Sequence, residues 1–551
     1  MSHPNATITR GYWLSGDMEP VKGDQALKTA LETISLPLYI LKGNDKDILT
    51  ATSGTALLGI DKSPDKNAHP LLAYAPPLMP ETLGDPHFIS KFNLHYPYIC
   101  GAMANGITSV NMVRKAGQAG MIGFFGAGGL TPDKVADAID QIQSKADNLP
   151  YGFNLIHSPN DPELEERIVQ LYLSRGVRLV SASAYMDLTF PLVYYRIKGI
   201  HRNRDGSVAC PNQIIAKVSR VEVARKFFSP PPEKLIQKLT EQGWVTAEEA
   251  KLARQIPMAD ALTAEADSGG HTDNRSALAL LPTMLALRDE MMAIYGFEQP
   301  VPVGLGGGIA TPDAAAAAFS MGAAYILIGS INQACIEAGT SATVRQMLAE
   351  AQQADVIMAP AADMFEMGVK VQVLKRGTMF PMRAAKLYEL YQTYITYEDI
   401  PLQQRKMLER DYFKSSFEEQ WQRTKDFFQQ RDAKQIERAQ ANPKHKMALV
   451  FRSYLGQSSH WANTGDPQRK IDYQIWCGPA MGAFNEWTRG SILEDTANRS
   501  IVTVAMNLLY GACVQLRANW LRYQGLALKS DIGRVRPLSR KSLYEKLNHH
   551  F

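Results

Sequence analysis

Two glycine-rich segments follow consecutive apolar runs, and they are the clearest chemical signal in this sequence of 551 residues. VPVGLGGGIATPD carries Gly307 and Gly308, and the next run, AAYILIGS, ends in Gly329 and Ser330. Glycine lets the main chain approach a ligand closely, and unpaired N–H groups at the start of a helix attract phosphate. Tight turns alone would also use these glycines. The occurrence of two such ends in succession nevertheless predicts a phosphate site.

The segment AEADSGGHTDNR presents a histidine from a polar loop. His271 follows Gly269 and Gly270 at the end of another apolar run. Imidazole exchanges a proton near neutral pH, which suits it to general acid–base work or to hydrogen bonding with a carbonyl. A histidine that only caps a helix fits the pattern equally well, so these residues alone make His271 a candidate.

Small or polar residues at the ends of three further runs are weaker candidates. In CGAMANGITS, Ala102 and Met103 lie where small residues leave room for a flat ring. Asn154 in GFNLI and Lys217 in IIAKV occupy corresponding positions. In a barrel, the side chains of Asn154 and Lys217 would point at a ligand. Alternatively, they would only form a loop hydrogen bond or a surface ion pair. Walker A, HExxH and GxSxG motifs are absent from the sequence.

Eight short apolar runs alternate with helical patterns between about residues 95 and 350, and these elements must position the candidates. The runs are YPYICGAM, GMIGFFG, YGFNLI, VRLVSAS, QIIAKV, ADALTAEA, VPVGLGG and AAYILIG. Such alternation predicts a parallel sheet, and eight strands close an α/β (β/α)₈ TIM barrel with its ligand site at the carboxyl ends of the strands. An open doubly wound sheet is the rival fold. It usually carries its phosphate loop after the first strand, whereas here the glycine-rich loops come late.

The sequence divides around this barrel, which we place at residues 91–355. Residues 1–90 predict a small N-terminal α+β domain, in which HPLLAYAPPLMP is a linker or a packed extended segment. Residues 356–551 predict a mainly helical C-terminal appendage with one long helix, SIVTVAMNLLYGACVQLRANWLRY. Insertions are expected near 186–212 and 220–257. Because each follows a strand, we expect both on the catalytic face, where they would shape a substrate mouth.

Composition indicates a folded protein and says little about partners. Hydrophobic residues make up 45% and charged residues 21%, which excludes intrinsic disorder and allows a large core. The formal net charge is only +4, so charge gives no argument for binding nucleic acid or a membrane. The five cysteines show no CxxC spacing, and we expect neither a disulfide framework nor a metal site. With no signal peptide or spanning segment recognised, we expect a cytoplasmic protein.

The quoted motifs carry a family resemblance. PYICGAMANGITS, the GGH of ADSGGHTD and the GLGGGI…LIGS pair resemble the nitronate monooxygenase-like flavoproteins, which include FMN-dependent enoyl-ACP reductases. ADSGGHTDNR and CGPAMGAFNEWTRGS look like the PfaD-type enoyl reductase subunit of polyunsaturated fatty acid synthases, which is related to trans enoyl reductases of polyketide synthases. This second resemblance covers nearly the whole chain.

The resemblance implies an FMN at the carboxyl face of the barrel and an enzyme that uses NADPH to reduce trans-2-enoyl thioesters carried on an acyl carrier protein. His271 matches the histidine that acts as catalytic base in the nitronate monooxygenases. By the same resemblance, the cofactor phosphate is held by Gly307, Gly308, Gly329 and Ser330, and the ring and ribityl chain are lined by Ala102, Met103, Asn154, Lys217, Gly269 and Gly270.

One departure from the family pattern favours enoyl reduction. Where nitronate monooxygenases typically have Gln and Glu-Ala, this chain has Ala264 and Asp267-Ser268. Two alternatives stay open, a nitronate monooxygenase-like flavin oxidase and a non-catalytic scaffold subunit of the synthase.

Partners beyond the substrate are less defined. Basic side chains such as Arg220, Arg225 and Lys226 are candidates for contact with an acidic carrier protein, although a charge run is more often a solvated face. The sequence leaves the oligomeric state open. A large helical appendage often packs against a second copy, which favours a homodimer.

Overall fold

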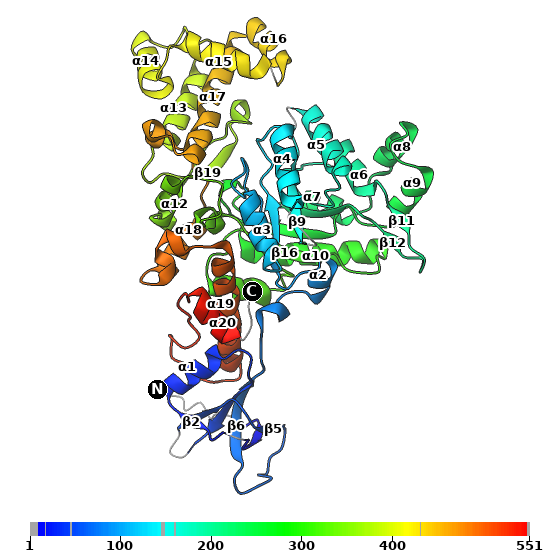
Figure 1. Ribbon diagram of the computed structural model, residues 1–551, viewed down its shortest axis with the longest axis vertical. Coiled ribbons are helices and arrows are strands. Elements are labelled where there is room, and N and C mark those ends of the chain that lie inside the picture. The colour runs from blue at the N-terminus through cyan, green and yellow to red at the C-terminus, as the bar shows by residue number, and fades with distance from the viewer. Residues whose placement is uncertain are drawn as a thin grey trace.

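The computed structural model describes residues 9–16, 18–43, 47–144, 149–158, 161–429 and 431–547. Its outline is elongated (Figure 1). A small sheet from the N-terminal part lies at one end, a group of helices from the C-terminal part lies at the other, and a strand-lined barrel projects to one side between them.

The N-terminal unit is an antiparallel sheet of six strands in the order β2-β4-β3-β6-β1-β5, accompanied by one helix. The segment HPLLAYA forms β6, which pairs with β1 on one side and β3 on the other, so the linker interpretation of this segment is wrong. The prolines that suggested a linker lie near the ends of the strand, where a missing N–H is tolerated. The elements are β1 (Gly11–Leu14), β2 (Val21–Lys22), α1 (Asp24–Glu32), β3 (Leu38–Lys42), β4 (Ile48–Ala51), β5 (Thr55–Leu58) and β6 (His69–Ala75).

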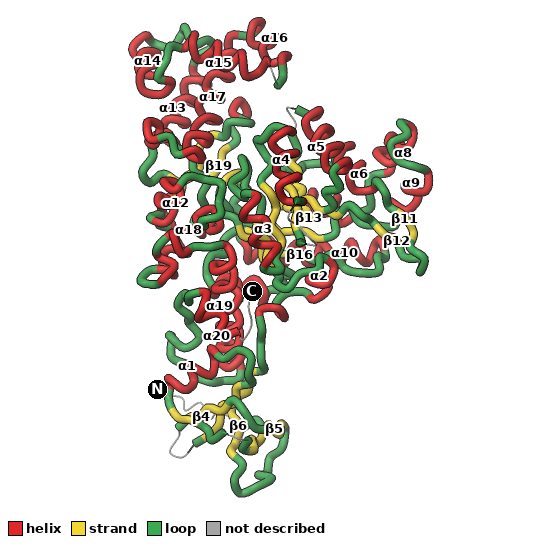
Figure 2. Tube along the Cα trace, in the orientation of Figure 1, coloured by secondary structure: helices red, strands yellow, loops and turns green. Residues whose placement is uncertain are grey.

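The middle of the chain is a closed barrel of eight parallel strands, which confirms the predicted fold class. Figure 2 shows the strands in yellow with helices around them. In barrel order the strands are β10 (Leu179–Ser183), β13 (Gln213–Val218), β14 (Ala261–Glu265), β16 (Val303–Gly306), β17 (Ile326–Ile328), β7 (Tyr98–Cys100), β8 (Ile122–Phe125) and β9 (Tyr151–Ile156). The helices that connect them are α3 (Val110–Gln118), α4 (Pro132–Gln143), α5 (Pro162–Ser174), α6 (Phe190–Ile197), α7 (Val221–Phe228), α10 (Ala277–Tyr295) and α11 (Pro312–Ser320).

Aromatic side chains fill the amino-terminal end of the barrel, and α2 (Pro86–Lys91) supplies one of them. Phe88 of α2 stacks on Tyr325, with 4.1 Å between the ring centroids. The Tyr325 hydroxyl shares a buried 2.8 Å hydrogen bond with Thr263 of β14. A barrel filled in this way is a packed core, so a ligand must bind at the opposite, carboxyl end of the strands.

The two expected insertions do not lie on the catalytic face. The first range contains the barrel helix α6 and then the hairpin β11 (His201–Arg202) and β12 (Val208–Ala209). The second contains the barrel helix α7 and then α8 (Glu233–Glu241) and α9 (Ala247–Ala253). Since the added elements follow a helix and precede a strand, they lie at the amino-terminal ends of the strands. There Arg196 of α6 forms a buried 2.6 Å ion pair with Asp260, directly before β14. The prediction that they shape a substrate mouth is therefore wrong.

Residues 356–473, which we name the helical module, begin with a hairpin that joins them to the barrel. Strands β18 (Val356–Pro360) and β19 (Lys370–Leu374) pair with each other, and β19 also pairs with β15 (Gly270–His271), a short strand in the loop after β14. The helices that follow enclose a core of their own. They are α13 (Phe380–Thr393), α14 (Leu402–Met407), α15 (Phe417–Gln429), α16 (Ala433–Ala441) and α17 (Pro443–Thr464).

Three further helices complete the barrel and the C-terminal part, α12 (Ala342–Ala349), α18 (Ala480–Thr488) and α20 (Arg540–Leu547). The predicted long helix is α19 (Ile501–Tyr523), which packs on α11 of the barrel. Among the described residues it is the one helix whose length and apolarity suit a membrane span, but 89% of its most apolar window is buried inside the protein. The helix is therefore a core element.

Arg517 of α19 ties the N-terminal unit to the C-terminal part. Its buried guanidinium donates to the main-chain oxygens of Leu31 and Thr33, at 3.0 Å each, and of Leu36, at 2.8 Å. We expect Arg517→Met to lower the free energy of unfolding by about 2 kcal/mol, because buried carbonyl oxygens lose their donors. Urea unfolding followed by circular dichroism checks this. Arg536→Met, at an exposed position, is the control, and an equal loss in both variants contradicts the expectation.

Candidate active site

The turn after β16 has a main-chain conformation that favours glycine. Gly307 has a φ of 90° and Gly308 a φ of 75°. A Cβ on Gly307 would lie 2.6 Å from the main-chain oxygen of Ala266, whereas a Cβ on Gly308 or Gly329 would meet no atom within 4 Å. Ser330 begins a short 3₁₀ helix directly after Gly329. Gly307 therefore packs on the loop after β14, whereas Gly308 and Gly329 face open space.

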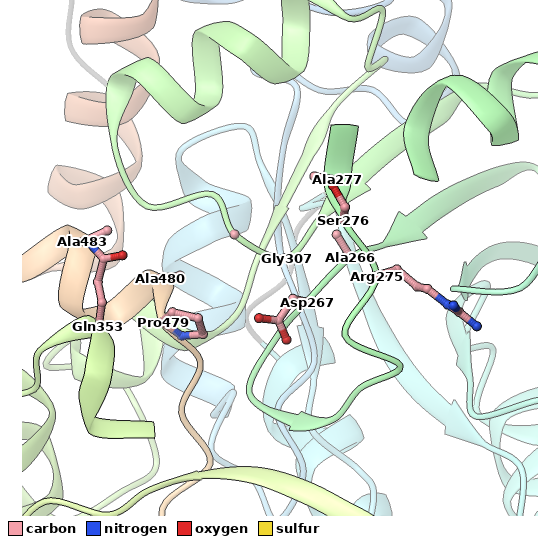
Figure 3. Close-up of a pocket in the computed structure, with 11 residues that line it drawn as sticks. Ala266, Asp267, Arg275, Ser276, Ala277, Gly307, Gln353, Pro479, Ala480 and Ala483 are labelled. Atoms are coloured by element: carbon pink, nitrogen blue, oxygen red, sulfur yellow. The ribbon is translucent and has the colours of Figure 1, made fainter. Parts of the chain in front are cut away.

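A cavity of about 220 Å³ lies beside this turn (Figure 3). Its walls come from the loop after β14, from the glycine turn and from the C-terminal part of the chain, and small side chains predominate. The lining residues are Ala266, Asp267, Arg275, Ser276, Ala277, Gly307, Gly308, Gln353, Pro479, Ala480 and Ala483. Of these residues, Gly307 and Gly308 were predicted as site residues and the other nine were not. The motif CGPAMGAFNEWTRGS was the signal in the sequence for Pro479, Ala480 and Ala483.

Lys217 is held by a carboxylate that the sequence analysis missed. The Nζ atom of Lys217, on β13, lies 2.6 Å from Oε1 of Glu265, at the end of the neighbouring strand β14. Both side chains are mostly buried, with 25% and 18% of their surface exposed. The ion pair balances the lysine charge within the barrel mouth, so a ligand there meets a paired ammonium group.

The predicted residues after β7 and within β9 lie at the same end of the barrel. Thr108 fixes the loop after β7, because its hydroxyl accepts from the N–H of Met103 at 2.9 Å and donates to the oxygen of Gly101 at 2.7 Å. Ala102, beside Met103, is partly exposed. Asn154 is buried, and its Oδ1 accepts a 2.8 Å hydrogen bond from the Ser183 hydroxyl.

His271 is half exposed and contacts a second carboxylate that was not predicted. Its Nε2 lies 3.2 Å from Oδ1 of Asp363, which belongs to the helical module. Burial of the ring opposes its charge, but the Asp363 carboxylate outweighs this effect and raises the pKa of His271 above its ordinary value. Burial likewise favours neutral Asp363, yet the hydrogen bond from His271 leaves the pKa of this carboxyl group lowered.

Gly269 and Gly270 contact the C-terminal part of the chain. A Cβ on Gly269 would lie 2.9 Å from the main-chain nitrogen of Cys477. Gly270 has a φ of 82° and lies against the ring of Trp476. The absence of side chains here therefore lets the His271 loop pack closely on residues 476–478.

The three basic side chains considered for carrier-protein contact all take part in ion pairs within the chain. The pairs are Arg220 with Asp273 at 3.0 Å, Arg225 with Glu290 at 2.7 Å, and Lys226 with Asp187 at 2.9 Å. Their charges are balanced locally, so the geometry lends no support to a carrier-protein contact through them.

The residues at this end of the barrel fit a flavin mononucleotide. The space beyond Gly308 and Gly329 leaves room for a phosphate, and the main-chain N–H groups of such a turn favour an anion. The Ser268 hydroxyl is buried and has no hydrogen-bond partner among the described residues, as expected of a group that a ligand would satisfy. Small side chains line most of the cavity beside this turn.

Two family profiles match the sequence. The profile described as nitronate monooxygenase matches residues 87–394. A profile described as the inserted helical domain of [acyl-carrier-protein] S-malonyltransferase matches residues 394–473, which form most of the helical module.

Curated relatives match more of the chain than the first profile does. One polyunsaturated fatty acid synthase subunit from Thraustochytrium sp. is 44% identical over 92% of this chain and 34% of its own length. Polyketide biosynthesis protein PksE of Bacillus subtilis is 48% identical over 79% of this chain and 57% of its own length. The chain thus spans about a third and just over a half of these two relatives. A probable nitronate monooxygenase of Bacillus subtilis is 25% identical over only 49% of this chain and 74% of its own length.

A solved structure also resembles this chain closely. It is the crystal structure of the enoyl reductase domain of MlnA from the macrolactin biosynthesis cluster of Bacillus amyloliquefaciens. The two share 38% identity with a TM-score of 0.75, over 81% of this chain and 99% of that chain. The shared structure must therefore extend well beyond the barrel.

Proposed function

The chain belongs to the nitronate monooxygenase family, and we propose that within this family it is an FMN-dependent enoyl reductase of polyunsaturated fatty acid or polyketide synthesis. The observation that carries the proposal is the extent of the similarity. The enoyl reductase domain of MlnA matches 81% of this chain, whereas the probable nitronate monooxygenase matches about half of it. Part of the cavity wall, from Pro479 to Ala483, comes from outside the region that the nitronate monooxygenase profile matches.

In this proposal the residues at the barrel mouth hold the flavin. Gly307, Gly308, Gly329 and Ser330 would bind its phosphate, and Ala102, Met103, Asn154, Lys217, Gly269 and Gly270 would line the ring and the ribityl chain. When bound, the flavin supplies hydride transfer from a reduced nicotinamide, which we take to be NADPH, to the β-carbon of a trans-2-enoyl thioester.

In this proposal a side chain of the protein donates the proton that the reaction requires. Reduction of the double bond also adds a proton at the α-carbon, and His271 in its charged form is the donor that we assign. Asp363 favours that charged form. The nearby Lys217 and Glu265 side chains form an ion pair, so they add little net charge near His271. The helical module pairs with the loop that carries His271 and so holds the main chain of this residue in place.

The partners follow from the relatives and are part of the same proposal. The relatives are named as synthase subunits or polyketide biosynthesis proteins, so we place the acyl chain on the phosphopantetheine arm of an acyl carrier protein. A cytoplasmic location and a homodimer complete the proposal. The matching family profile favours one competing function, a nitronate monooxygenase-like flavin oxidase.

We expect purified protein to carry a flavin whose visible absorption band is bleached by NADPH without oxygen and recovers when an enoyl thioester is added. Anaerobic stopped-flow spectroscopy measures both steps. Recovery with oxygen and a nitronate, but not with the thioester, would establish the oxidase instead. A colourless protein that cannot be reconstituted with FMN would leave the scaffold interpretation.

A further inference from the structure

The helical module fixes the main chain of the loop that carries His271. Strand β15, which contains His271, pairs only with β19 of the module among the described strands. Buried Gln372 of β19 donates from Nε2 to Oδ1 of Asp267 at 3.0 Å and to the main-chain oxygen of Ser268 at 2.8 Å. The loop leaves the barrel after β14, but residues about a hundred positions further along the chain set its path.

Asp363 is held in place by the same module. It lies in the connection between β18 and β19. Arg452 of α17 donates from Nε to the main-chain oxygen of Ala362 at 2.8 Å, and its Nη1 lies 3.1 Å from Oε1 of Glu366. These contacts on both sides of Asp363 fix the connection relative to α17. The contacts of Arg452 therefore hold the segment that carries the Asp363 carboxylate beside His271.

The geometry distinguishes the two ring nitrogens of His271. Nε2 faces Oδ1 of Asp363 at 3.2 Å, and pairing of β15 fixes the main chain to which the ring is attached. No hydrogen bond to Nδ1 is seen among the described residues. A carboxylate at one ring nitrogen sets the tautomer and turns the other nitrogen toward the next partner. Nδ1 is therefore the atom available to a substrate.

Three charged groups act on the His271 ring. Asp363 and Glu265 favour its charged form, and Lys217 opposes it. Because Glu265 and Lys217 are themselves paired at 2.6 Å, their effects on the ring largely cancel. Asp363, in direct contact with the ring, is left as the group that decides its charge.

We propose that Asp363 is a positioning residue, which orients His271 so that Nδ1 meets the substrate and stabilises the imidazolium that gives up the proton. The kinetic consequence rests on the proposed enoyl reduction, whereas the effect on the histidine itself does not. The proposal gives the helical module a role in the active site.

The test compares Asp363→Asn with the wild-type protein. Glu290→Gln, which removes an exposed carboxylate on α10, is the matched control. We expect NMR of ¹³C-labelled histidine, with the His271 signal assigned from its loss in His271→Gln, to show that His271 releases its proton at lower pH in Asp363→Asn than in the wild type. Glu290→Gln should titrate like the wild type. An unchanged His271 titration in Asp363→Asn overturns the proposal.

Kinetics separate a positioning role from a merely structural one. With flavin content unchanged, we expect enoyl reduction by Asp363→Asn to fall about tenfold above neutral pH and less below it, because an unassisted imidazole is charged only at lower pH. Asp363→Glu should restore part of the rate. A uniform loss at every pH contradicts the proposal. If the wild type reduces no enoyl thioester, the proposed function is wrong. The NMR titration still tests whether Asp363 stabilises the charged form of His271.

Discussion

Replacing His271 with alanine is expected to slow enoyl reduction about 100-fold or more while the flavin stays bound. The imidazole is the group in the loop after β14 that can give up a proton near neutral pH, and Asp363 favours its charged form. Water would have to protonate the α-carbon in its place. The glycine turn proposed to bind the phosphate, in contrast, does not depend on this side chain, so the cofactor should remain.

Stopped-flow reoxidation of the reduced protein by an enoyl thioester measures this loss. Reduction by NADPH should be unchanged in His271→Ala, which separates proton donation from cofactor or nicotinamide binding. His201→Ala, on the exposed hairpin at the opposite end of the barrel, is a suitable control. Wild-type reoxidation in His271→Ala would remove His271 from the mechanism.

The barrel could be predicted because its pattern is local. Each of the eight strands is a short apolar run next to a helical pattern, and every predicted run contains a barrel strand. The glycine turn could also be predicted. Gly307 has a φ of 90°, a conformation that favours glycine, and the run of glycines is visible in the sequence. The insertions were misplaced because α6 and α7 were counted with the residues that follow them.

The partners of the predicted residues could not be found in the same way. Glu265 and Lys217 are 48 positions apart, and Asp363 and His271 are 92 positions apart. Neither separation fits a local motif. The second contact requires the hairpin of the helical module to pair with the loop after β14, a tertiary arrangement that no periodicity in the sequence encodes. Sequence reasoning thus named the candidate groups and missed the carboxylates that the structure places beside Lys217 and His271.

Replacing Gly307 with alanine is expected to weaken flavin binding about 100-fold, equivalent to about 3 kcal/mol. Two effects add at this position. The left-handed conformation costs a non-glycine residue about 1–2 kcal/mol. The new methyl group would also lie 2.6 Å from the main-chain oxygen of Ala266, so the turn must move away from the loop after β14. That movement displaces the N–H groups assigned to the phosphate.

Flavin fluorescence titration of the apoprotein measures the affinity, and Gly296→Ala separates the two effects. Gly296 also has a positive φ, 64°, but its Cβ would meet no atom within 4 Å, and it lies at the far end of α10. This control should lose about 1 kcal/mol of stability and keep its flavin. If Gly307→Ala binds FMN as tightly as the wild type, the phosphate site does not lie at this turn. If both variants lose flavin equally, general destabilisation explains the result and the glycine turn has no special role.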